Sequence, residues 1–460
     1  MYQFDVAIMG GGPGGYVAGI RCAQAGFKTV LFERERVGGT CLNIGCIPTK
    51  TLLKNAEMLE EIAAAPARGI SVGKPEINMP TIIKMKNEVV SQLTSGVQYL
   101  LKGNGVTLIS GEAEVLTNHV LRANGEEYTF DKLIIATGSS NFVPPIQGLD
   151  LPGIMTSTEL LNIDHVPERL IIIGGGVIGC EFATIFNQFG CKVTIIEMLP
   201  NIVSMMDADI SEMLRNLMGR KGIDIKTGCK VLSAEADREG YTVKFCKSDG
   251  ETAVDTISAE KVLVSVGRTP NLKGFENLKL AMNGSYIAVN ERMQTSIEDI
   301  YAVGDITGTI QLAHVASTQA NIAVENIAGR AAVMEYNAVP NCIFTLPEIA
   351  SIGLAEAAAR SDFGNVKIGK FPFAGCGKAL AMGHPEGFVK VIAAADTGKL
   401  LGCHIIGVNA TELIAEAAAV MHAGKGIDDI AETIHSHPTV SEAIAEAAHA
   451  AQGKPLHILK

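Results

Sequence analysis

The sequence predicts an α/β protein with two dinucleotide-binding βαβ units and a C-terminal α+β domain. The glycine-rich loop Gly10–Gly15 recurs 164 residues later as Gly174–Gly179, and such a repeat indicates one structural unit used twice. In each copy an apolar strand precedes the loop, and a helix, a second strand and an acid follow it, as in a βαβ unit. Near Pro340 the composition changes to strand-like segments and Ala-rich helices, which favours a separate α+β domain.

The first unit begins with a predicted strand over Phe4–Met9 and ends at Glu33. Gly10 permits a tight turn, Gly12 lets the backbone approach a pyrophosphate, and Gly15 packs helix against strand, with the phosphates at the helix N-terminus. Glu33 can accept a hydrogen bond from a ribose 2′-hydroxyl. The alternative for Glu33 is an ordinary carboxylate at a strand end.

The second unit repeats this pattern with Gly174, Gly176, Gly179 and Glu197. A single loop of this kind is weak evidence, because glycine turns also arise from packing alone. Two copies with the same acid spacing are specific for Rossmann-like dinucleotide-binding domains. Glu197 is followed by Met198-Leu199 rather than by arginines. A 2′-phosphate would meet a carboxylate and no cation there, so the sequence predicts NAD rather than NADP.

Cys41 and Cys46 are separated by four residues and lie just after the first unit. On a regular helix, residues five positions apart are separated by about 8–9 Å between Cα atoms, which exceeds the disulfide span of about 4.4–6.8 Å. A disulfide therefore requires a bend, for which Gly45 and Pro48 supply the freedom and the stop. The pair predicts electron transfer through a disulfide, and the alternative is two unrelated core cysteines.

Several predicted strands end in residues suited to a ligand. Gly138 and Gly267 each follow an apolar strand, and Asp305 follows the strand-like Ile300–Val303. Ligands of open α/β sheets lie at such strand ends. Asp305 can hydrogen-bond a cofactor sugar or polyol, or it can be a turn residue.

The tail after Pro340 carries a candidate acid–base pair, His437 and Glu442. A disulfide enzyme needs a base to deprotonate the attacking dithiol, and a carboxylate can orient the imidazole. Two alternatives remain open: Glu442 can belong to a capping box that begins at Thr439, and His435 with His437 can be half of a metal site. No Cys/His cluster completes such a site, so no metal is predicted. The tail predicts strands over Phe388–Ala394 and Leu401–Val408 and helices over Asn409–Ala423 and Thr439–Ala451.

Composition narrows the functional classes. With 47% hydrophobic and 19% charged residues and a net charge of −11, the chain is typical of a globular protein. It has no basic run, so we expect no nucleic-acid partner. No apolar run reaches the roughly 18 residues of a membrane span. The absence of a leader pattern and the scattered positions of the other eight cysteines favour a cytoplasmic location.

These motifs together resemble the dihydrolipoamide dehydrogenases, within the pyridine nucleotide-disulfide oxidoreductase family, over essentially the full chain. The matching segments, in order, are Gly10–Gly15, Cys41–Lys50, Gly174–Glu181, Gly267–Asn271, Gly304-Asp305, and His437–Thr439 with Glu442.

The resemblance implies that the first loop binds FAD and the second NAD. It implies that Glu33 contacts the adenosine ribose of FAD and Asp305 the ribityl chain. Cys46 would then lie against the flavin while Cys41 faces the thiol substrate, and Lys50 would pair with Glu181 beside the flavin. From sequence alone, Lys50 could equally be a solvated lysine and Glu181 a helix-start acid. The further cofactor-contacting positions it implies are Gly138, Gly267 and Ala313.

The resemblance also implies a domain order and an assembly. Residues 1–145 would bind FAD, 146–272 would bind NAD, 273–339 would return to the FAD domain, and 340–460 would form the interface of a homodimer. His437 and Glu442 would complete the partner subunit's disulfide site, so a monomer should be inactive. We also expect a cis His437–Pro438 peptide.

The function implied is oxidation of protein-bound dihydrolipoamide to lipoamide with NAD as acceptor. The lipoyl group would arrive on a protein of a 2-oxo acid dehydrogenase complex or the glycine cleavage system, and the sequence does not choose between them. The alternatives are an NAD(P)H-dependent reductase of another disulfide and a non-catalytic flavoprotein redox sensor. A sensor needs no base, so His437 and Glu442 disfavour the last.

Overall fold

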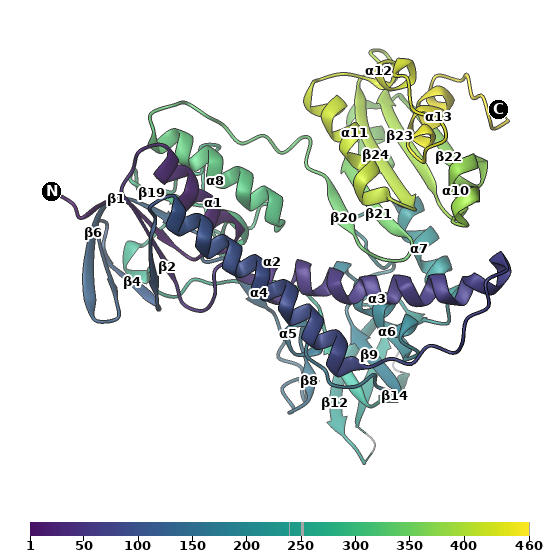
Figure 1. Ribbon diagram of the computed structural model, residues 1–460, viewed down its shortest axis with the longest axis horizontal. Helices are drawn as coiled ribbons and strands as arrows, with labels where there is room; N and C mark the ends of the chain where they lie inside the picture. Colours follow the sequence, from purple (N-terminus) through teal and green to yellow (C-terminus); the bar gives the residue numbers. More distant parts are fainter. Residues whose placement is uncertain (239, 250–252, 460) are drawn as a thin grey trace.

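The computed structural model describes residues 1–238, 240–249 and 253–459. Figure 1 shows three lobes: one around the N-terminus, one at the bottom of the view, and one that contains the C-terminus. The first two contain largely parallel sheets and the third an antiparallel sheet with helices. This arrangement confirms the predicted α/β fold class with two Rossmann-like units and a C-terminal α+β domain.

The first sheet joins distant parts of the chain. Its strand order is β3-β2-β1-β6-β5-β4, and β19 pairs parallel with β6. Val6, Ala7 and Ile8 at its centre are fully buried, as expected for a parallel strand covered on both faces. Helices α1 and α8 pack together beside it (Figure 1). The elements are β1 Phe4–Met9, α1 Pro13–Gln24, β2 Thr29–Glu33, β3 Thr107–Ser110, β4 Ala113–Thr117, β5 Val120–Ala123, β6 Glu126–Ile135, β19 Ile300–Ala302, η3 Gly304–Thr307 and α8 Ala313–Ile327.

The second sheet repeats this plan with five parallel strands in the order β11-β10-β9-β15-β8. The three-stranded antiparallel sheet β12-β13-β14 packs beside it through a shared apolar cluster. The elements are β8 Ile154–Met155, α5 Ser157–Leu160, β9 Arg169–Ile173, α6 Val177–Gln188, β10 Lys192–Ile196, α7 Ala208–Arg220, β11 Asp224–Lys226, β12 Cys229–Ala236, β13 Tyr241–Lys247, β14 Val254–Ala259 and β15 Lys261–Val264.

Two long helices connect the lobes. Helix α3 packs against α6, and α4 crosses the molecule from the second lobe to the first (Figure 1). The buried Lys86 on α4 donates to Leu161 O (2.8 Å) and Asn162 Oδ1 (2.7 Å), which anchors this helix to the second lobe. The remaining elements are α2 Gly39–Ile44, α3 Cys46–Ala64, η1 Ala65–Arg68, α4 Met79–Gly103, β7 Ser139–Asn141, β16 Arg268–Pro270, η2 Glu276–Leu278, β17 Met282–Asn283 and β18 Tyr286–Ile287.

The C-terminal lobe is an antiparallel sheet in the order β20-β21-β24-β23-β22. All residues of β23 and β24 are buried, because helices cover both faces of the sheet. Val389 and Val391 share an apolar cluster with α11 and α13, whereas Lys390 points to α7 and α9. The elements are β20 Asn341–Ile343, β21 Glu348–Gly353, α9 Glu356–Phe363, β22 Val366–Pro372, η4 Phe373–Gly375, α10 Gly377–Met382, β23 Phe388–Ala394, β24 Leu400–Gly407, α11 Ala410–His422, α12 Ile427–Glu432 and α13 Glu442–Ala451.

The predicted tail elements agree with the structure except at one helix start. Strand β23 has the predicted bounds, and β24 and α11 differ by a residue at each end. Helix α13 begins at Glu442, three residues later than predicted, because the Glu442 carboxylate accepts the Thr439 amide and residues 440–441 form a turn. The prediction for this boundary was wrong.

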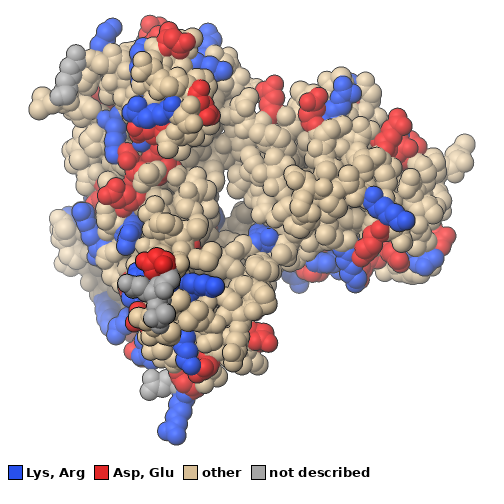
Figure 2. Space-filling model, turned by 180° about the vertical axis from the view of Figure 1, so that it is seen from behind, with Lys and Arg blue, Asp and Glu red and all other residues tan. Residues whose placement is uncertain are grey.

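The described surface is mixed in charge. On the face shown in Figure 2, Lys and Arg side chains are interspersed with Asp and Glu. Among the described helices, none combines the length and apolarity needed to cross a membrane.

A buried ionic cluster connects the second lobe to the C-terminal lobe. Lys390 is 2% exposed, and its ammonium lies 2.9 Å from Asp207, 3.1 Å from Asp209 and 2.6 Å from Glu356. Burial raises the pKa of Asp207, but hydrogen bonds from the Glu356 amide and from Lys390 outweigh it and bring that pKa below its ordinary value. The stabilisation from this lowered pKa is present at neutral pH and is lost as the pH falls through it.

We expect Lys390→Met to lower the free energy of unfolding by about 3 kcal/mol or more, because it leaves the buried Asp207 carboxylate without its counter-charge. Urea unfolding at neutral pH measures the loss. The control is Lys370→Met: Lys370 also binds Asp209 (3.0 Å) but is 46% exposed, so its loss should cost under about 1 kcal/mol. Equal effects of the two substitutions would contradict the role of burial.

Candidate active site

The two glycine loops have the same geometry in three dimensions. In each, a loop amide donates to Oε2 of the acid at the end of the second strand, and the amide two residues after the acid donates to Oε1. The repeated βαβ pattern therefore places each acid beside its own loop. The four contacts are Gly11 N to Glu33 (2.7 Å), Glu35 N to Glu33 (2.7 Å), Gly175 N to Glu197 (2.6 Å) and Leu199 N to Glu197 (2.7 Å).

The protein's own packing explains two of the three glycines in each loop. A Cβ on Gly15 would lie 1.8 Å from the Gly10 carbonyl oxygen, and one on Gly179 would lie 2.0 Å from that of Gly174. Gly10 and Gly174 have positive φ angles of 98° and 106°, which side chains rarely adopt.

The middle glycine of each loop has no such constraint. A Cβ on Gly12 would meet no atom closer than 3.8 Å, and one on Gly176 would meet nothing within 4 Å. Both have φ angles that alanine adopts readily, −69° and −76°. The open space at these helix N-termini therefore fits a dinucleotide pyrophosphate, for which backbone amides and the helix dipole are suited. From behind, a hollow separates the N-terminal lobe from the other two (Figure 2).

The cysteine segment bends where the five-residue spacing requires it. Helix α2 ends at Ile44, Gly45 adopts φ −141° and ψ −112°, and α3 begins at Cys46. A Cβ on Gly45 would lie 2.8 Å from the Thr40 carbonyl oxygen, so the bend also depends on the missing side chain.

Both cysteines are free thiols whose side chains hydrogen-bond to each other. The hydrogen bond from Cys41, aided by the nearby Lys50 ammonium and opposed by burial, lowers the pKa of Cys46 to about 7. The same bond, together with burial, raises the pKa of Cys41. These opposite pKa shifts favour the thiolate on Cys46 rather than on Cys41, and a thiolate is the reactive form in disulfide exchange.

Lys50 and Glu181 form an ion pair next to this thiol. Lys50 Nζ lies 2.8 and 2.9 Å from the two Glu181 carboxylate oxygens. Their side chains are 28% and 5% exposed. Lys50 comes from α3 and Glu181 from α6, so the pair joins the segment after the first βαβ unit to the second unit, close to Cys46.

Asp305 is held by side chains as well as by its turn. Ser139 Oγ donates to its carboxylate, and Arg268 Nε lies 3.8 Å from it. The Arg268 guanidinium also donates to Ser139 O (2.6 Å) and to Asn141 Oδ1 (2.9 Å). The sequence motifs include the segment that contains Arg268, but they do not predict its contacts with Ser139 and Asn141, which lie about 130 positions away.

Two buried polar atoms lack a hydrogen-bond partner in the described chain, Asn43 Oδ1 and Gln311 Nε2. Asn43 lies between the two cysteines, and Gln311 lies two residues before Ala313, the first residue of α8. Buried polar groups are nearly always paired, so an unmet acceptor and donor at these two places fit a bound flavin.

Gly138 and Gly267 have φ angles of 67° and 133°, and a Cβ on either would meet nothing within 4 Å.

His437 and Glu442 are in contact, and Glu442 also caps the turn. His437 Nδ1 lies 2.9 Å from Glu442 Oε1, while the Thr439 amide donates to Oε2 (2.9 Å). The Thr439 amide and then His437 lower the pKa of Glu442. The capping and the base-orienting interpretations are thus compatible. The expected cis His437–Pro438 peptide is present.

The same histidine is 80% exposed, and no hydrogen bond or ion pair joins it to Cys41 or Cys46 among the described residues of one chain. His435 does not share its environment: its ring contacts Glu416 (2.9 Å) and the Thr433 carbonyl (2.9 Å). In the described ranges no group of three His, Cys, Asp or Glu side chains is arranged to hold a metal.

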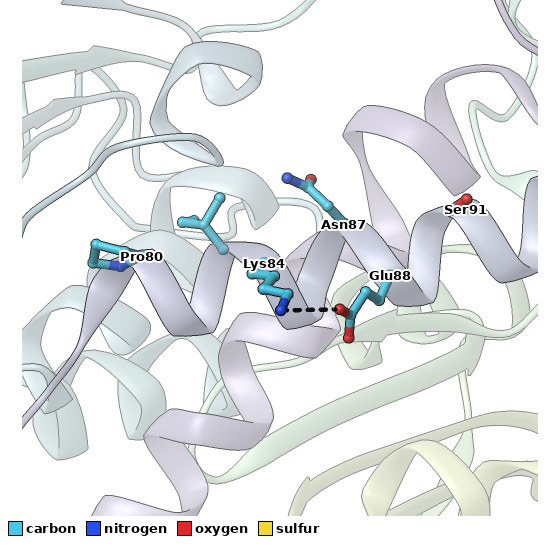
Figure 3. Close-up of a pocket in the computed structure, with 6 residues that line it drawn as sticks. Pro80, Lys84, Asn87, Glu88 and Ser91 are labelled. Atoms are coloured by element: carbon cyan, nitrogen blue, oxygen red, sulfur yellow. Dashed lines mark ion pairs between the residues drawn. The ribbon is translucent and has the colours of Figure 1, made fainter.

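A shallow concavity on the outer face of α4 is unrelated to these residues. Figure 3 shows that Lys84 and Glu88 pair across one helical turn there, at 3.9 Å. None of its lining residues is a predicted site residue; they are Pro80, Ile83, Lys84, Asn87, Glu88 and Ser91.

Comparison with known proteins matches this arrangement. Residues 4–320 match the family model described as pyridine nucleotide-disulphide oxidoreductase, and residues 339–448 match the dimerisation domain of that family. A dihydrolipoyl dehydrogenase of Bacillus subtilis is 42% identical and covers 99% of both chains. One of Thermus scotoductus is 40% identical over all of both chains.

Solved structures agree with the sequence comparison. LpdA from Mycobacterium tuberculosis has a TM-score of 0.89 at 26% identity, covering 97% of this chain and 99% of that one. The HOCl-induced flavoprotein disulfide reductase RclA from Escherichia coli has a TM-score of 0.86 at 30% identity, covering 96% and 99%.

The middle glycines allow a matched pair of tests. We expect Gly12→Ala to fold but to bind FAD at least about tenfold more weakly, because the new methyl group enters the pyrophosphate space. Gly176→Ala should retain FAD and raise the KM for NAD by a similar factor. Flavin absorbance after dialysis and steady-state kinetics measure the two effects. If both variants kept wild-type FAD content and KM, the loops would not be the dinucleotide sites.

Proposed function

Because the chain belongs to the pyridine nucleotide-disulphide oxidoreductase family, we propose that it is a dihydrolipoyl dehydrogenase that uses FAD and NAD. The observation that carries this proposal is the hydrogen-bonded pair of Cys41 and Cys46 at the helix break, next to the Lys50–Glu181 ion pair. Full-length identity of 39–42% to proteins named dihydrolipoyl dehydrogenase supports the substrate.

The proposed reaction starts with the oxidised cysteine pair. His437 takes a proton from one thiol of the dihydrolipoyl group, and the resulting thiolate attacks Cys41 Sγ. The Cys41–Cys46 bond breaks and Cys46 leaves as a thiolate, for which its low pKa is suited. The second substrate thiol then attacks the substrate sulfur that is bonded to Cys41. The lipoyl disulfide forms, the bond to Cys41 breaks, and Cys41 takes up the proton of the second thiol.

FAD, when bound, supplies a two-electron acceptor for the reduced pair and a hydride donor for NAD. In the proposal Glu33 and the Gly10–Gly15 loop hold FAD, Asp305 binds its ribityl chain, and Glu197 with the Gly174–Gly179 loop holds NAD. Lys50, paired with Glu181, keeps a positive charge beside the Cys46 thiolate. Gly138, Gly267 and Ala313 remain proposed cofactor contacts.

A homodimer fits the match to the family's dimerisation domain. We propose that residues 1–145 with 273–339 form the FAD domain, that 146–272 form the NAD domain, and that 340–460 form the interface. His437 and Glu442 of one subunit would then complete the disulfide site of the partner, which accounts for an exposed base. The other eight cysteines are free thiols, which supports the proposed cytoplasmic location.

The alternatives have less support. Met198 and Leu199 are exposed next to Glu197 and offer no cation to a 2′-phosphate, which disfavours an NADPH-dependent reductase. A redox sensor would not require the contact between His437 and Glu442. The lipoyl-carrying partner, from a 2-oxo acid dehydrogenase complex or the glycine cleavage system, is not distinguished by any of these residues.

The test is NAD reduction by dihydrolipoamide with FAD-reconstituted protein, run beside NADPH with oxidised glutathione. We expect turnover in the first assay alone. Activity in the second assay only would indicate a reductase of another disulfide, and activity in neither would favour the sensor.

Glu442→Gln distinguishes the base-orienting role from the capping role. Glutamine can still accept the Thr439 amide but provides no negative charge for His437, so we expect kcat to fall by about 10² or more with FAD content unchanged. Glu446→Gln is the control, since Glu446 lies on the same helix and pairs with His457 (2.7 Å). Wild-type turnover of Glu442→Gln would leave Glu442 as a cap only.

A further inference from the structure

Phe344 contacts both members of the ion pair beside the redox-active thiol. It follows β20, the first strand of the C-terminal lobe, and its amide donates to Glu181 Oε1 at 3.0 Å. Its ring centroid lies 4.4 Å from Lys50 Nζ. Phe344 therefore orients the Glu181 carboxylate through its amide and covers the Lys50 ammonium with its ring.

The ring is suited to hold a positive charge. The face of an aromatic ring carries negative quadrupole density and attracts an ammonium within about 6 Å of its centroid. On the other side of the ammonium lies Glu181 of α6, which is almost fully buried. Lys50 is thus held between a carboxylate and a ring, and loss of the ring would leave the ammonium with fewer restraints.

The loop that carries Phe344 is anchored on both sides. The Thr345 hydroxyl is buried and donates to Pro347 O (2.7 Å), and Lys221 Nζ donates to Leu346 O (3.0 Å). Lys221 also binds Glu60 of α3 (2.6 Å). These contacts tie the loop to the helix that carries Lys50, so the ring keeps its position relative to the ammonium.

We propose that Phe344 is a positioning residue that holds the Lys50 ammonium beside the Cys46 thiolate and so couples the C-terminal lobe to the redox centre. This inference rests on the proposed roles of Cys46 and Lys50. The charged groups that face Cys46 are Lys50, which lowers the pKa of its thiol, Glu181, which raises it, and the Arg268 guanidinium, whose own pKa is raised by the Cys46 thiolate although burial lowers it overall. A small displacement of the ammonium therefore changes the ionisation of this thiol.

The experiment compares Phe344→Leu with Phe344→Tyr in the FAD-loaded, chemically two-electron-reduced dimer. The long-wavelength absorbance that a thiolate gives beside flavin is titrated against pH. We expect Phe344→Leu to raise the titration midpoint by roughly 0.5 to 1 pH unit, while Phe344→Tyr, which retains a ring, stays at the wild-type midpoint. Phe344→Met carries the same prediction if the leucine variant does not fold.

The matched control is Phe388→Leu, because the Phe388 ring lies 3.9 Å from Lys370 Nζ elsewhere in the same lobe. It should leave the midpoint unchanged. A wild-type midpoint in the folded Leu and Met variants, an equal shift in the control, or the absence of a pH-dependent absorbance in the wild type would overturn the inference. The readout uses neither dihydrolipoamide nor NAD, so a failed turnover assay would refute the proposed function without affecting this result.

Discussion

The ion pair between Lys50 and Glu181 is the constraint on which the active-site arrangement depends. It crosses from α3, which begins at Cys46, to α6, which begins at the second glycine loop. Burying one charge alone is costly, typically about 3–5 kcal/mol when a partner is removed. The two helices must therefore keep the register that joins these side chains, and α3, which begins at Cys46, is held against α6 of the second unit.

The bend at Gly45 brings the two cysteine side chains together. A continuous helix would keep Cys41 and Cys46 too far apart for a disulfide, whereas the break lets the two thiols hydrogen-bond. The same break makes Cys46 the first residue of α3, where the helix dipole favours an anion. Lys50, one turn further along the same helix, adds a full positive charge on that side. Local geometry and the Lys50 charge thus favour the thiolate on the same sulfur, whereas the Glu181 carboxylate opposes it.

Much of this could be predicted from the sequence because it is encoded in short-range patterns. The repeated loops, the acids that end them and the bend at Gly45 follow from glycine positions and from spacing along a helix. The start of α13 was misplaced because Glu442 accepts the Thr439 amide and delays the helix, a choice that depends on one hydrogen bond. The contacts of Phe344 and Arg268 could not be predicted, because they join residues about 130 to 290 positions apart through packing between lobes.

The two acids also show how a backbone can contribute to nucleotide selection. Glu197 accepts one amide on each carboxylate oxygen, so its side chain cannot turn away to make room for another group. A ribose 2′-hydroxyl can donate to a remaining lone pair of this carboxylate, whereas a 2′-phosphate would bring negative charge against an acid that has no freedom to move. Replacing Met198 or Leu199 by arginine would therefore add a cation but leave the carboxylate in place. In the proposed role of Glu197, discrimination against the phosphate lies in the loop that holds this side chain as much as in the residues that follow it.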